Sequence, residues 1–201
     1  MPSPDDIARE AARLVATGVS ADVTHAIRLA TERLGPSDAH APGSGRVRAH
    51  LRAMTEQTLG AEGYRAEVRR VWSIAETLMT LIEETLPDAR TTLAGRGAEG
   101  KIDGGVTLHL RVGTERPLAE LVDRLVTHGY EEPAFETANT RFGRLDRIRF
   151  VEEGTPVVVT RCLPSIRVEE QRDLFEGRPI SVLDLDGVRA RLDVSPPPAA
   201  P

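Results

Sequence analysis

The chain has 201 residues and a formal net charge of -5, with 40% hydrophobic and 28% charged residues. These proportions are ordinary for a globular protein and exclude disorder of the whole chain. The negative charge disfavours nucleic acid and anionic lipid as partners, because either would require a local basic patch. Cys162 is the only cysteine, which excludes an intrachain disulfide and a zinc site built from several thiolates.

The hydropathy pattern predicts neither export nor membrane insertion. No stretch approaches about eighteen uninterrupted apolar residues, and residues 1–6 are acidic and precede an amphipathic segment, unlike a signal peptide. A single thiol suits a reducing compartment. We therefore expect a cytoplasmic protein.

The first part of the chain carries apolar residues at helical spacing. This spacing predicts one helix over residues 7–15 and a second over residues 23–34. Asp5 and Asp6 suit the first helix start, and Ser20 or Asp22 can cap the second. The two helices form a predicted hairpin over residues 1–35, followed by a loop rich in Pro, Gly and Ser over residues 36–45.

A second helical segment is predicted over residues 46–88. It holds a helix over residues 46–58, a break at Leu59-Gly60 and a long helix over residues 61–86. The apolar stripe of the long helix includes Trp72 and is typical of a helix that packs on a core, rather than of a cofactor site.

After residue 89 the period of the pattern shortens to that of strands. Strands are predicted at residues 91–94, 106–112, 145–151 and 156–162, with a glycine-rich turn over residues 95–105 and a helix over residues 117–128. The segment that ends at Leu192 is either a strand or a short helix, and residues 193–201 are predicted to be disordered. The expected fold class is α+β, with a helical N-terminal half packed on a small mixed sheet over residues 89–192.

Arginine clusters around the predicted hairpin and is the sharpest functional signal. Arg147 and Arg149 alternate with apolar residues, and if the two strands pair, Arg161 could project from the same face. Guanidinium groups suit phosphate or carboxylate ligands. The alternative is a solvated face balanced by Glu152 and Glu153. His109 is either a hydrogen-bonded buried histidine or part of a polar pocket.

The order of strand, glycine turn, strand and helix resembles the signature region of the nucleotidyltransferase superfamily. In that family a Gly-Ser or Gly-Gly turn precedes two carboxylates on the next strand, and a later strand supplies a third. Here Gly95 matches the turn glycine and Arg96 stands at the second turn position. Thr107 and His109 occupy the two carboxylate positions, and residues 156–160 carry no carboxylate.

This departure bears directly on activity. Nucleotidyl transfer depends on magnesium, which requires oxygen ligands and usually several carboxylates. The resemblance therefore implies a non-catalytic, nucleotidyltransferase-like protein without a cofactor, which binds a protein partner or a phosphorylated ligand. The candidate ligand-binding residues are Gly95, Arg96, Thr107, His109, Arg147, Arg149 and Arg161.

Two alternatives remain open. An active nucleotidyltransferase would hold magnesium and a nucleoside triphosphate with Glu99, Asp103 and Asp146. A structural protein would instead form homo-oligomers, which an exposed apolar helix face would support. Residues 7–14, the glycine turn and Gly177-Arg178-Pro179 also resemble small bacterial proteins, which implies a bacterial origin and no known activity.

Overall fold

A computed structural model describes residues 2–20, 22–35, 40–130, 133–166 and 171–193. In these residues five helices accompany one mixed sheet of six strands, so the expected α+β class is confirmed. The chain divides into two compact units. The first comprises residues 1–67 and 102–105, and the second comprises residues 68–101 and 106–201. No helix in the described ranges is long and apolar enough to cross a lipid bilayer.

The first unit contains α1 (Pro4–Ala16), α2 (Val23–Leu34) and the start of α3 (Ser44–Thr85). Ser3 and Asp6 form a reciprocal capping box at the start of α1, and Asp22 caps α2 through the His25 amide. Alanines provide much of the core between the two helices, and their small side chains allow close packing. They are Ala8, Ala11, Ala12, Ala26 and Ala30.

Helix α3 is interrupted at Gly60, where the sequence predicted a break between two helices. Gly60 has φ 70° and ψ 169°, a conformation outside the helical region that glycine adopts without a Cβ penalty. The helix therefore consists of two stretches, and residues from Val68 onward belong to the second unit.

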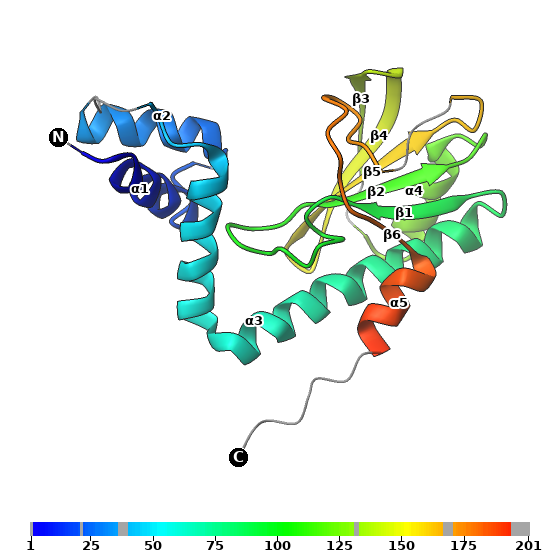
Figure 1. Cartoon of the computed structure of the whole chain (residues 1–201). Coiled ribbons are helices and arrows are strands. Elements are labelled where there is room, and N and C mark those ends of the chain that lie inside the picture. Colours follow the sequence, from blue (N-terminus) through cyan, green and yellow to red (C-terminus); the bar gives the residue numbers. More distant parts are fainter. Residues whose placement is uncertain (1, 21, 36–39, 131–132, 167–170, 194–201) are drawn as a thin grey trace. The chain divides into compact units, whose positions relative to one another are not determined.

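The sheet of the second unit has the strand order β3-β4-β5-β2-β1-β6. Strands β2 and β5 are parallel, and all other neighbouring strands are antiparallel. The strands are β1 (Arg90–Ala94), β2 (Leu108–Gly113), β3 (Ala134–Thr140), β4 (Gly143–Glu152), β5 (Thr155–Cys162) and β6 (Val182–Asp184). Helices α4 (Leu118–Thr127) and α5 (Leu185–Asp193) complete this unit, and Figure 1 shows the second stretch of α3 running alongside the sheet near α5.

One face of the sheet is apolar and is covered by α3 and α4. Its buried side chains alternate along the strands, as expected for a sheet packed on helices. Glu83 of α3 accepts hydrogen bonds from the amide and hydroxyl of Thr91, at 3.0 and 2.6 Å. The Trp72 indole donates to the Gly97 carbonyl at 2.9 Å. The buried residues of this face include Leu93, Leu108, Leu110, Ile148, Val157 and Val159.

Strand β3 was not predicted from the sequence. Its residues are mostly exposed and polar, since the strand lies at the edge of the sheet, and an edge strand carries little apolar alternation. The C-terminal segment forms both proposed elements, β6 followed directly by α5. The predicted disordered tail lies outside the described residues beyond Asp193.

Substitution of Gly100 should destabilise the second unit more than substitution of Gly95. Both residues have positive φ, 66° and 72°, so alanine costs roughly 1–2 kcal/mol at either position. A Cβ at Gly100 would also lie 3.0 Å from the Trp72 ring and 3.1 Å from Val68, whereas a Cβ at Gly95 meets no atom within 4 Å. We expect Gly100→Ala to lower the free energy of unfolding by a further 1 kcal/mol, roughly. Urea unfolding followed by Trp72 fluorescence measures the difference, and equal effects would contradict this packing.

Candidate functional site

The face of the sheet opposite the helices gathers basic side chains from β2 and β4. The register places Val158 of β5 between His109 and Arg149, and Thr160 between Arg111 and Arg147. Because residues in register point to the same face of a sheet, all four polar side chains lie on one side. We call His109, Arg111, Arg147 and Arg149 the arginine face.

A single carboxylate connects the arginine face to the edge strand. Oε1 of Glu136 in β3 lies 2.9 Å from Arg147 and 2.8 Å from Arg149. Two guanidinium groups therefore share one carboxylate oxygen. Each pair is a charge-assisted hydrogen bond, but one negative charge cannot neutralise two positive ones.

Arg147 is a buried ionised group of this cluster. Only 10% of its side chain surface is exposed, and its Nε atom is buried without a hydrogen-bond partner among the described residues. The Phe175 ring lies 5.9 Å from the guanidinium carbon and adds a cation–π contact. The guanidinium is thus largely desolvated while its donors are incompletely used.

The loop over residues 171–180 borders the arginine face. Arg111 donates to the carbonyl of Arg172 at 2.7 Å, and Leu174 packs against Leu145 and Cys162. The carboxylate of Asp173 accepts from three backbone amides of the same loop, which gives the loop a defined conformation. Cys162 is buried, and burial raises the pKa of its thiol.

His109 reports a positive potential on the arginine face. Loss of hydration, followed by repulsion from Arg147, Arg149 and Arg111, lowers the pKa of His109 to about 4. The residue is in contact with solvent, and water partly screens these charges. The imidazole is neutral at pH 7.

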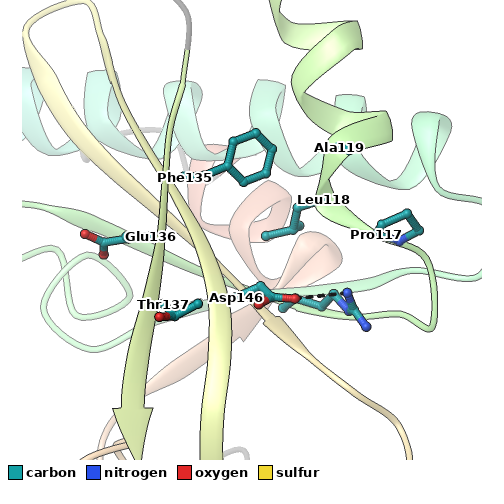
Figure 2. A pocket seen from close by; sticks show the side chains of 8 residues that line it. Pro117, Leu118, Ala119, Phe135, Glu136, Thr137 and Asp146 are labelled. Atoms are coloured by element: carbon teal, nitrogen blue, oxygen red, sulfur yellow. Dashed lines mark hydrogen bonds and ion pairs between the residues drawn. The ribbon is translucent and has the colours of Figure 1, made fainter.

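Arg161 does not share this face, contrary to the expectation that it projects with Arg147 and Arg149. It is one residue out of phase with Thr160, so its side chain lies on the face covered by the helices. There it forms an ion pair of 3.1 Å with Asp146. Both residues line a hollow of about 450 Å³ between β3 and α4. Figure 2 shows Phe135 and Leu118, two further residues of its lining, pointing towards one another.

The predicted ligand-binding residues Gly95, Arg96 and Thr107 lie next to the ends of β1 and β2. Gly95 directly follows Ala94, the register partner of His109, and its amide donates to Ser181. Arg96 is half-buried, and its charge helps to lower the pKa of Glu99, after the hydrogen bonds from Lys101 and Ser181. Thr107 is half-buried just before β2. None of these three contributes to the pKa shift of His109.

The alternative magnesium ligands have other partners. Glu99 forms an ion pair of 2.5 Å with Lys101 and accepts a hydrogen bond from the Ser181 hydroxyl. Asp146 pairs with Arg161, and Asp103 accepts from the Tyr64 hydroxyl at 3.4 Å. Across the described residues, no three His, Cys, Asp or Glu side chains gather into a set that could hold a metal ion.

Two members of the site were not among the predicted ligand-binding residues. Arg111 alternates with His109 in the sequence, so its face was foreseeable. Glu136 could not be placed, because β3 itself was not predicted.

Neither a family of known proteins, nor a curated protein, nor a solved structure matches the chain.

The pKa of His109 should rise when a neighbouring arginine loses its charge. We expect NMR titration of the imidazole to give a pKa well below 6.5 in the wild type, a higher value in Arg149→Gln and no change in Arg144→Gln. Arg144 is an exposed arginine on the opposite face of the same strand. The His109→Gln variant assigns the signal, and a wild-type pKa near 6.5 would contradict the positive potential.

The lowered pKa of His109 also determines how this residue makes the stability of the fold depend on pH. A histidine whose pKa is lower in the folded chain than in the unfolded chain binds its proton first in the unfolded chain. Its protonation therefore lowers the free energy of unfolding as the pH falls from about 6.5 towards 4. The loss of stability between pH 7 and pH 5 should therefore be smaller in His109→Gln than in the wild type. Equal losses in urea unfolding at the two pH values would show that His109 makes no contribution.

Proposed function

We propose that the protein binds an anionic, phosphorylated ligand on the arginine face without catalysing a reaction on it. The observation that carries this proposal is the arrangement of Arg147 and Arg149 around one shared oxygen of Glu136. A phosphate group offers several oxygens in the geometry that guanidinium forks prefer. It would satisfy donors and neutralise charge that Glu136 alone leaves uncompensated.

The polarity of His109 supports the same ligand class. A neutral imidazole can donate from one nitrogen and accept at the other, so it can contact a phosphate without adding charge to a site that is already positive. The lowered pKa also implies linkage, because an anion bound nearby would favour the imidazolium form. Anion binding and protonation of His109 should therefore reinforce each other.

A nucleotidyltransferase-like origin is part of the proposal. The order of strand, glycine turn, strand and helix motivates it, and Thr107 and His109 at the carboxylate positions favour binding over transfer. We place this activity in a bacterial cytoplasm, in keeping with the single buried thiol. A protein partner that presents a phosphorylated side chain would use the same contacts.

Inorganic phosphate is the simplest probe of this site. At constant ionic strength set with chloride, we expect phosphate to raise the pKa of His109 and to shift its NMR signal with saturation. Arg149→Gln should weaken phosphate binding at least about fivefold, the range expected for one charge-assisted hydrogen bond. Arg144→Gln should change the affinity less than about twofold.

The controls separate a site from general charge. A non-saturating response, or equal losses in the two arginine variants, would refute binding at the arginine face. Titration with ATP in the presence and absence of magnesium tests the catalytic alternative. Magnesium-dependent tightening together with nucleotide transfer to an acceptor would contradict a non-catalytic role.

Glu136→Gln should have opposite effects on stability and on binding. Loss of the carboxylate leaves the enclosed Arg147 guanidinium without its ion-pair partner, which should lower the free energy of unfolding by about 1–3 kcal/mol. The same change removes the internal competitor for phosphate, so phosphate affinity should rise. Chemical denaturation and calorimetric titration measure the two effects.

Asp146→Asn provides the matched control, since it removes one carboxylate from the same sheet on the opposite face. This variant should not increase phosphate affinity. An equal gain in both variants would assign the effect to net charge, and weaker binding in Glu136→Gln would mean that Glu136 helps to hold the ligand.

A further inference from the structure

The two edges of the sheet differ in how well they are protected. At one edge β6 has three residues and leads directly into α5. At the other edge β3 has seven residues and is paired with β4 along its whole length, from Ala134 to Thr140. Within the described residues no strand pairs with the outer side of β3. Such an edge presents unpaired backbone groups to another strand.

The hairpin that joins β3 to β4 determines which backbone groups point outward. Thr140 and Gly143 flank a loop of two residues and close the ladder as a hydrogen-bonded pair. Because hydrogen-bonded and non-hydrogen-bonded pairs alternate in an antiparallel ladder, the amides and carbonyls of Phe135, Thr137 and Asn139 face the outer edge. Three alternate residues of β3 therefore each present an amide and a carbonyl group at the outer edge.

The edge lacks the features that usually prevent pairing. Strand β3 contains no Pro, Lys or Arg, and its only charged residue is Glu136. The carboxylate of Glu136 is engaged by Arg147 and Arg149 on the arginine face. Phe135, with 59% of its surface exposed, lies at the start of the strand and borders the hollow beside α4.

The edge is complementary to itself in one antiparallel register. With Thr137 opposite Thr137 of a second copy, Phe135 lies opposite Asn139 and all three outward residues find hydrogen-bonded partners. Glu136 then lies opposite Ala138 rather than opposite another glutamate. In the neighbouring register Glu136 would lie opposite Glu136 of the second copy, so two carboxylates would face each other. Pro133, which has no amide hydrogen, would then lie opposite Asn139.

We propose that two copies of the chain associate through antiparallel pairing of their β3 strands, centred on Thr137. Two six-stranded sheets then form one continuous sheet across a two-fold axis. The side chain of Phe135 in each copy lies next to that of Asn139 in the other, on the face that carries the hollow. The arginine faces of both copies remain accessible, so this association is independent of phosphate binding.

A cysteine scan of β3 tests both the association and its register. In a Cys162→Ala background, which removes the only native cysteine, Thr137→Cys should be crosslinked to a dimer by a short bis-methanethiosulfonate reagent. Residues opposite each other in such a pair have Cβ atoms about 5 Å apart. Asn139→Cys is the matched control, because its two copies would be about 14 Å apart along the strand.

The association itself is measured by analytical ultracentrifugation over a range of protein concentrations. The wild type should show a concentration-dependent dimer, which Thr137→Lys should weaken at least about tenfold because two ammonium groups would lie opposite each other. Ser73→Lys makes the same charge change on the exposed side of α3 and should have no effect. Thr137→Val should retain the dimer, and circular dichroism verifies that each variant is folded.

Two results would overturn the proposal. One is a wild type that stays monomeric at all concentrations without crosslinking of Thr137→Cys. The other is a dimer that is equally stable in Thr137→Lys and that crosslinks through Asn139→Cys but not through Thr137→Cys. Either outcome would leave the outer edge of β3 to a different partner or to none.

Discussion

The parallel register between β2 and β5 is the constraint on which the arginine face depends. It aligns His109 with Val158 and Arg111 with Thr160, and the antiparallel pairing of β5 with β4 then adds Arg149 and Arg147 to the same two rows. A slip of one residue would exchange the two faces of a strand. Buried leucines and valines on the opposite face oppose such a slip, since it would expose them to water. Apolar packing under α3 and α4 therefore fixes the position of charged groups on the other side.

Burial of the Arg147 guanidinium is energetically unfavourable by itself, and this indicates which class of ligand the site favours. Desolvation of a guanidinium group is repaid only when acceptors of good geometry surround it. Glu136 supplies one acceptor oxygen, which it divides between Arg147 and Arg149. Burial and the charge of Arg149 accordingly lower the pKa of Arg147. A ligand with several anionic oxygens would relieve both costs, whereas a cation or an apolar ligand would relieve neither.

Elements with a buried apolar face could be predicted from the sequence, whereas an element without one could not. The helices over residues 7–15, 23–34 and 61–86 were recognisable from apolar spacing, and the break at Gly60 from its glycine. Strand β3 was missed because only Ala138 is buried along it, so tertiary pairing alone explains its conformation. Missing β3 also concealed Glu136. The misplacement of Arg161 has a different cause, since strand pairing was foreseen but the register, which local sequence does not encode, was not.

The alternation of β3 separates two properties within one short strand. Glu136 and Ala138 direct their side chains to the arginine face, and their backbone groups bond to β4. Phe135, Thr137 and Asn139 do the reverse, with side chains on the helix-covered face and backbone groups at the outer edge. A side-chain change at residue 136 therefore alters the charge around Arg147 without altering the edge. A change at residue 137 alters the edge and the contact with Arg144 but lies on the other side of the sheet from the arginine face. Ligand binding and self-association can be tested separately because a strand repeats every two residues.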